Sequence, residues 1–214
     1  MACEMNVEDV SQTGPTARQQ EKEARLAEAP GVTRLVKVWC HEDPAWSLQL
    51  LRCAAPSLEL LSVYFALEDH LREVHDAMPR LRRLELSGGY ALLHAQPPEL
   101  PTLPPGRDGL QWLSVGTLPR ATTQSLLKAH AGTLEELQLY VGTPGIKEWP
   151  DTCGDLHSLL QQSGLQALRR LVLRRWGCSH KPVTCSEQRA EVRRVLPGAE
   201  VLCSECDPVE LAEV

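Results

Sequence analysis

The sequence LRRLEL at residues 81–86 is one copy of a phrase that recurs along the chain. The pattern is Leu-x-x-Leu-x-Leu, with Val or Cys sometimes in place of Leu. It reads LVKVWC at 35–40, LELLSV at 58–63, LRRLEL at 81–86, LQWLSV at 110–115, LEELQL at 134–139 and LRRLVL at 168–173. The first residues of these six phrases are 23, 23, 29, 24 and 34 positions apart. Such a repeat predicts units that are each too small to bury their own apolar face, and therefore a short solenoid of stacked units.

The segments between the phrases carry helix signals. Asp43 is suited to cap a helix and Pro44 to occupy its first position. Leu71, Val74 and Met78 are three and four residues apart, so they form one apolar helix face. Helices are therefore expected at about 45–54, 68–78, 121–131, 155–163 and 186–196, with a terminal strand at 199–203. Each unit then consists of one strand and one returning helix, which predicts an α/β fold with a parallel sheet and helices on its outer side.

Composition limits the function. The chain has 214 residues, 35 of them Leu against one Phe and one Ile, and a net charge of −6. Acidic and basic residues are intermixed, without the basic stripe that nucleic-acid binding requires. No apolar run approaches the ~20 residues of a membrane span, and the first residues lack the pattern of a secretory signal. The eight cysteines are therefore expected to be reduced, in the cytoplasm or nucleus.

The repeats set the expected domain organisation. Residues 31–205 should form the repeat domain, with long connections at 88–109 and 141–155. Residues 1–30 are polar, and Leu26 is the only large apolar residue of the helix-prone stretch 17–29. This segment is expected to be a disordered or loosely helical tail. Residues 206–214 should form a short acidic tail.

The phrases MPRLRRLELSGG (78–89) and AGTLEELQLYVG (131–142), each a helix end running into a strand, resemble the repeat region of F-box leucine-rich-repeat proteins. The resemblance implies a leucine-rich-repeat solenoid of about six or seven irregular repeats with a concave, strand-lined face. Members of that family present substrates to cullin-type ubiquitin ligases, so the resemblance also implies a protein partner and ubiquitin-ligase components. The sequence departs from the family because no F-box precedes the first repeat. The Asn or Cys that usually follows the repeated phrase is also missing.

The strand residues that alternate with the inward leucines should line the concave face. The chosen candidates for partner binding are Trp39, Tyr64, Arg83, Glu85, Trp112, Tyr140, Arg170 and Arg174. Trp, Tyr and Arg are the usual energetic anchors of protein interfaces. The four aromatic residues of this set, Trp39, Tyr64, Trp112 and Tyr140, should be substantially exposed to solvent. The pattern therefore favours a non-enzymatic protein-interaction module. The competing interpretation is that these aromatic rings pack beneath the long connections or the tails.

A second hypothesis is a metal-binding or redox protein centred on Cys178, Cys185, Cys203 and Cys206, with His180 among them. Cys203 and Cys206 have the spacing of a zinc-ligand pair. Cys178 and Cys185 are a poorer second pair, and Cys203 falls on an expected core strand. We therefore expect reduced thiols, no metal and no cofactor. The sequence contains no nucleotide-binding loop and no hydrolase motif, so no catalytic residues are expected.

Overall fold

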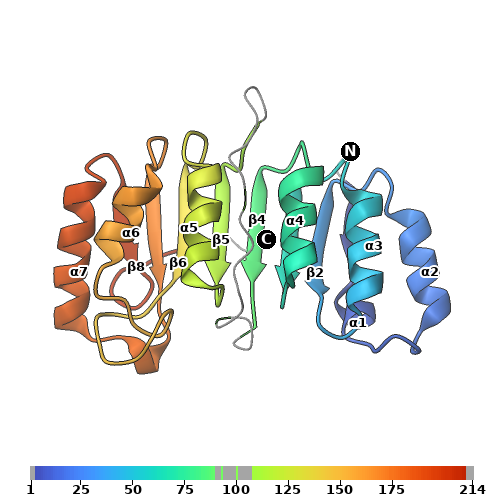
Figure 1. The fold of residues 1–214 in the computed structure, drawn as a ribbon, viewed down its shortest axis with the longest axis horizontal. Helices are drawn as coiled ribbons and strands as arrows, with labels where there is room; N and C mark the ends of the chain where they lie inside the picture. Colours follow the sequence, from blue (N-terminus) through green and yellow to red (C-terminus); the bar gives the residue numbers. More distant parts are fainter. Residues whose placement is uncertain (1–2, 90–92, 94–99, 101–107, 211–214) are drawn as a thin grey trace.

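The structure, a computed structural model, describes residues 3–89, 93, 100 and 108–210. Its centre is one open sheet of eight parallel strands, whose spatial order is the order of the chain (Figure 1). The strands are β1 (Glu4–Asn6), β2 (Arg34–Trp39), β3 (Leu60–Tyr64), β4 (Arg83–Ser87), β5 (Trp112–Gly116), β6 (Glu136–Tyr140), β7 (Arg170–Arg174) and β8 (Glu200–Cys203). The six repeated phrases therefore form neighbouring parallel strands, as predicted, and the terminal strand is also present. The arrangement is that of a solenoid-like α/β fold.

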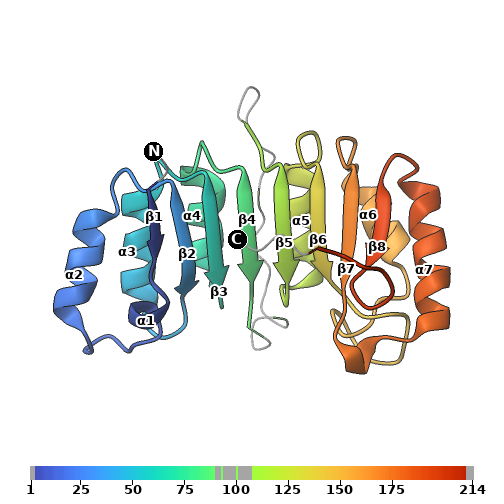
Figure 2. The same cartoon turned by 180° about the vertical axis from the view of Figure 1, so that it is seen from behind.

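Helices cover one face of this sheet. They are α1 (Glu8–Ser11), α2 (Gln19–Glu28), α3 (Pro44–Ala54), α4 (Glu68–Ala77), α5 (Arg120–Ala129), α6 (Leu156–Ser163) and α7 (Pro182–Val195), with the 3-10 helix η2 (Gly177–Ser179) before α7. In Figure 1 helices α3 to α6 lie in front of the strands, and in Figure 2 they lie behind them. We call the opposite side of the sheet, which these helices do not cover, the open face.

The sheet is held to the helices by rows of aliphatic side chains that run across the strands. One row contains a residue from every strand in register: Met5, Leu35, Leu61, Leu84, Leu113, Leu137, Leu171 and Val201. All eight are buried in the hydrophobic core. A second row runs through Val38, Val63, Leu86, Val115, Leu139, Leu173 and Cys203. The repeated phrase thus places the same apolar side chains on top of one another in successive units.

The first 30 residues differ from the expectation of a disordered tail. Glu4–Asn6 adds strand β1 to the edge of β2, and Met5, Val7 and Val10 are buried in the same core as the repeats. The loose helix expected in this segment is present as α2. The sequence pattern missed the strand because β1 is only three residues long and lacks the repeated phrase. The repeat domain therefore begins before residue 31.

A buried ion pair fastens α2 to the start of α3. The Lys22 side chain is 2% exposed, and its Nζ lies 2.7 Å from the Asp43 carboxylate. The same ammonium donates to the backbone carbonyls of Thr13 and Gly14. Asp43 also accepts the backbone N–H of Trp46 and so caps α3, as the sequence predicted. A single carboxylate therefore starts a helix and neutralises a buried cation.

The start of one helix differs from the prediction. Helix α7 begins at Pro182, four residues before the expected start at residue 186, so Cys185 lies in its first turn. The long connection at 141–155 is described and contains no helix or strand. Most of the proline-rich connection at 88–109 lies outside the described residues.

Replacing Leu113 by Ala should lower the free energy of unfolding by about 2–5 kcal/mol, because the side chain is completely buried in the middle of the first aliphatic row. Urea denaturation of the purified protein measures this loss. Ile146→Ala is the matched control, since Ile146 is fully exposed and its truncation should change stability little. Equal losses for the two variants would contradict the stacked-row account.

Replacing Lys22 by Ala should cost about 3–5 kcal/mol of stability, because it leaves the Asp43 carboxylate buried without its counter-ion. Arg25 lies on the same helix and forms an exposed ion pair with Glu28. Arg25→Ala should therefore change stability by only about 0.5 kcal/mol or less. Denaturant unfolding of both variants checks the difference, and a mild effect of Lys22→Ala would show that α2 does not dock.

Candidate functional site

The open face carries its own rows of side chains, which alternate along each strand with the buried aliphatic residues. A first row contains Arg34, Leu60, Arg83, Trp112, Glu136, Arg170 and Glu200. A second row contains Ser62, Glu85, Ser114, Gln138, Val172 and Leu202. A third, near the carboxyl ends of the strands, contains Trp39, Tyr64, Ser87 and Gly116, then Tyr140 and Arg174. All eight side chains that the sequence proposed for partner binding lie on this face.

A hollow of about 290 Å³ opens between the second and third rows. Two tyrosines, Tyr64 and Tyr140, line it, and Phe65 and Trp176 are the other aromatic residues in its wall. The Glu85 carboxylate is the one charged group in the described lining. The volume is near the lower end of the roughly 300–1,000 Å³ that small-ligand pockets have, and it suits a single side chain.

Neutral donors hold the Glu85 carboxylate in place. Its Oε2 accepts hydrogen bonds from the Ser62 hydroxyl at 2.9 Å and from the Tyr64 hydroxyl at 3.0 Å. Among the residues that the structure describes, no Lys, Arg or His forms an ion pair with this carboxylate. The negative charge in the hollow is thus oriented by hydrogen bonds and not neutralised by an ion pair.

The pKa values of the two tyrosines that line the hollow are raised. Burial raises the pKa of the Tyr64 phenol to about 12; the Ser62 hydrogen bond opposes this shift, and the Glu85 charge adds to it. The pKa of Tyr140 is also raised, first by burial, although the nearby Arg174 guanidinium lowers it. Both phenols are therefore neutral hydrogen-bonding groups over the physiological pH range.

The backbone of the hollow has unusual geometry at two equivalent points. Phe65 and Thr117, each directly after a strand, have φ angles of 54° and 50°. These values lie in the left-handed region that residues other than Gly rarely adopt, and such residues gather at functional sites. Gly116 is also required here, because a Cβ on it would lie 2.9 Å from the Tyr140 ring. The ring packs directly over the β5 backbone at this point.

Trp39 lies outside the lining of the hollow but extends its aromatic wall. Its ring centroid is 5.3 Å from those of Tyr64 and Phe65, and His41 lies 4.4 Å from Phe65. Four rings from β2, β3 and the residues after them therefore form one aromatic patch. Such contacts keep the rings rigid before any partner arrives.

Trp112 does not have the exposure that an anchor residue requires. It lies on the open face as expected, but it is only 5% exposed. The Arg83 guanidinium lies over its ring at 4.9 Å, and Glu136 flanks it in the same row. Long charged neighbours can cover an aromatic ring in this way, which a strand pattern does not reveal. The expectation of a substantially exposed Trp112 is therefore corrected.

The remaining proposed residues, Arg170 and Arg174, lie on β7 and contact side chains of the neighbouring strands β6 and β8. Arg170 lies 3.3 Å from Glu136 and 3.9 Å from Glu200. Arg174 donates to the Gln138 side-chain oxygen at 3.0 Å and lies over the Tyr140 ring at 4.6 Å. Arg174 thus supports one wall of the hollow, whereas Arg170 belongs to a separate ion-pair network.

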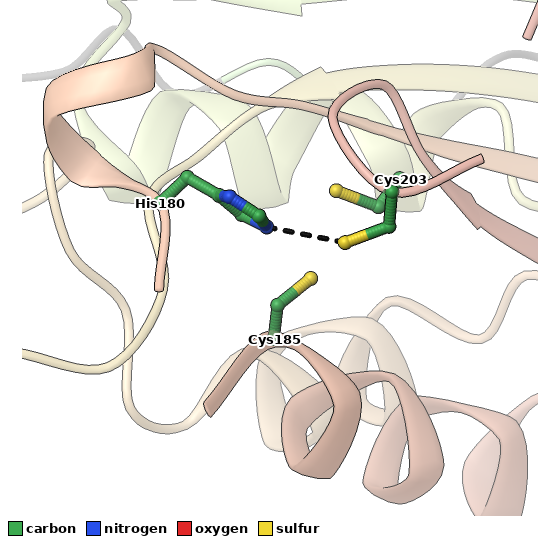
Figure 3. Close-up of side chains that lie close together, drawn as sticks. His180, Cys185 and Cys203 are labelled. Carbon is green, nitrogen blue, oxygen red and sulfur yellow. Dashed lines mark hydrogen bonds between the residues drawn. The ribbon is translucent and has the colours of Figure 1, made fainter. Parts of the chain in front are cut away.

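The C-terminal cysteines form a second cluster at the end of the sheet. One ligand-type atom each from His180, Cys185, Cys203 and Cys206 lies within 4.8 Å of all the others. Figure 3 shows His180, Cys185 and Cys203 pointing toward one another, and the His180 Nε2 lies 3.3 Å from the Cys206 Sγ. Cys178, which the sequence hypothesis paired with Cys185, is exposed and lies outside this cluster. His180 takes its place.

Sequence reasoning missed several of these residues for identifiable reasons. Phe65 lies one place beyond β3 and Trp176 lies two places beyond β7, so the strand pattern did not assign these two residues to the open face. The sequence hypothesis placed His180 among these cysteines, but it took Cys178 as the partner of Cys185 because zinc sites usually contain two cysteine pairs. The spacing His180-x4-Cys185 followed by Cys203-x2-Cys206 was the signal that could have identified the cluster.

Comparison of the chain with protein-family models, with curated proteins and with solved structures finds no match. Within the described residues, no helix has both the length and the apolar character to cross a membrane. The function must therefore be argued from the two clusters themselves.

The free energy of unfolding should fall between about pH 10 and pH 12, in part because the Tyr64 phenol has a raised pKa in the folded protein. The folded-state pKa of this phenol is raised from 10 to about 12, so the unfolded chain loses the proton first as pH rises. The contribution is complete below pH 10 and lost as the pH passes the folded value. Urea denaturation at stepped pH should show a shallower fall for Tyr64→Phe. Identical pH profiles for the two proteins would contradict the burial of this phenol.

Proposed function

We propose that the chain is a leucine-rich-repeat solenoid that binds a polypeptide on its open face and holds a basic side chain of that partner in the hollow between Tyr64 and Tyr140. The observation that carries this proposal is the Glu85 carboxylate, which is set among aromatic rings and has no ion-pair partner among the described residues. A cation placed over Tyr or Trp rings gains about 0.5–2 kcal/mol, and the Glu85 charge attracts the same group. A Lys or Arg side chain provides both contacts.

Three further features support a binding role for this face. The described helices leave the face uncovered, and its third row ends in the aromatic patch. The rings of the patch already contact one another, which lowers the entropy cost of binding. Phe65 and Thr117, which line the hollow, have left-handed backbone angles that cost conformational free energy. Strained residues of this kind gather at functional sites. The resemblance to F-box leucine-rich-repeat proteins would make the partner a substrate for ubiquitination, which stays a prediction of the resemblance.

Selection from a random peptide library displayed on phage tests the proposal. Peptides that bind the wild-type protein should be enriched in Lys or Arg, and replacing that residue by norleucine in a synthetic peptide should weaken binding at least about tenfold, or 1.4 kcal/mol. Glu85→Gln keeps the size and the hydrogen-bond acceptor but removes the charge, so it should produce a similar loss. Isothermal titration calorimetry measures both effects.

Glu68→Gln is the matched control, because Glu68 is an exposed carboxylate on α4, on the helical side of the sheet. This variant should bind the selected peptide as the wild type does. Peptides that lack basic residues, or that bind Glu85→Gln and wild type equally, would overturn the assignment of the hollow.

A further inference from the structure

The cysteine–histidine cluster has the composition of a closed metal site. It offers three thiols and one imidazole, a donor set that is characteristic of structural zinc. With Zn–S distances of about 2.3 Å and Zn–N distances of about 2.0 Å, a tetrahedral zinc ion separates its ligand atoms by about 3.5–3.8 Å. The four atoms are at most 4.8 Å apart, so each needs to move by only a small amount to reach that geometry.

The two inner cysteines of the cluster are buried. Cys185 and Cys203 are completely inaccessible to solvent. Cys203 occupies the last place of the second aliphatic row, where earlier strands carry Leu or Val. The sulfur atoms of Cys185 and Cys203 nevertheless lie within 4.8 Å of the ligand-type atoms of His180 and Cys206.

A buried cation, the Arg175 guanidinium, lies beside the cluster. Arg175 is 6% exposed, and its Nη2 lies 4.0 Å from the Cys185 sulfur. Its other described contacts are neutral: the Val141 carbonyl and the Gln188 side-chain oxygen. No carboxylate of a described residue forms an ion pair with it. A buried charge of this kind is costly unless an opposite charge lies close by. Three thiolates and one Zn²⁺ ion carry a net charge of −1, and this negative charge would lie close to the Arg175 guanidinium.

The surrounding contacts already orient the ligands. The Asp207 carboxylate accepts the backbone N–H of Cys203 at 2.7 Å and forms an ion pair with Arg189 at 2.8 Å, so the turn from Cys203 to Asp207 is fixed. The Ser204 hydroxyl accepts the backbone N–H of Arg175 at 3.1 Å, which joins this turn to the end of β7. Outer contacts of this type hold metal ligands in position.

The geometry points to a structural Zn²⁺ site formed by His180, Cys185, Cys203 and Cys206. Binding replaces the protons of the three thiols, which pass to solvent, and the neutral imidazole coordinates through Nε2; no oxidation occurs. The ion would join the segment before α7, the first turn of α7 and the end of β8. Four protein ligands leave no open position for a substrate, so the role is structural. The site is independent of the hollow on the open face.

Metal analysis of the full chain tests this assignment. Protein prepared with added zinc and then freed of excess metal should retain one zinc ion per chain. Cobalt(II) in its place should give the visible absorption of a tetrahedral site and a thiolate charge-transfer band. Cys206→Ser should bind zinc at least about 100-fold more weakly, because even loss of an outer contact costs 10- to 100-fold. Cys206 is exposed, so this change does not create a cavity in the core.

Cys178→Ser is the matched control, because Cys178 is two residues from His180 but outside the cluster. It should retain the zinc and the cobalt spectrum. His180→Ala provides a second ligand variant and should lose both. Three results would overturn the assignment: wild-type protein without stoichiometric zinc, a disulfide among the three cysteines in protein isolated anaerobically, or equal zinc loss in Cys178→Ser.

Discussion

The stacking of one aliphatic side chain on its counterpart in the next strand is the interaction on which the rest of the structure depends. Leu35, Leu61 and Leu84 are completely buried, and each lies directly beside the equivalent residue of the neighbouring strand. No unit could bury its leucines alone. This requirement fixes the register of the sheet, because a shift of one residue would turn the buried row to the open face. The positions of Tyr64, Glu85 and Tyr140 follow from the same register.

Polar side chains are buried at the two ends of the sheet, whereas leucine side chains fill the core in its middle. At one end Lys22 and Asp43 form a buried ion pair beneath α2. At the other, the His180, Cys185, Cys203 and Cys206 cluster lies where β8 meets α7. Outer strands lack one neighbour and expose backbone groups and apolar surface. Directional interactions at both ends compensate for the contacts that a further repeat would have supplied.

The repeated phrase was sufficient to predict the strands, the helices between them and the face on which the candidate residues lie. It could not predict features that depend on single contacts between distant segments. Strand β1 was missed because three residues carry no period, and Lys22 because a charged residue is normally exposed. Trp112 was expected to be exposed because alternation gives the face of a strand but not what its neighbours cover. His180 was named among the C-terminal cysteines, but Cys178 was paired with Cys185 in its place, because spacing along the chain does not show which side chains meet.

The sequential order of the strands has a consequence for motion. Within the described sheet, each strand forms its ladder hydrogen bonds with the strands before and after it in the chain, so opening of the structure need not be all or none along its length. An outer unit can detach while the central ones remain paired, and the free energy of local opening rises from the ends toward β4 and β5. Amide hydrogen exchange would follow that gradient. The hollow between Tyr64 and Tyr140 lies on the central strands, where exchange should be slowest. Local opening of the outer strands would therefore leave the binding surface for a partner intact.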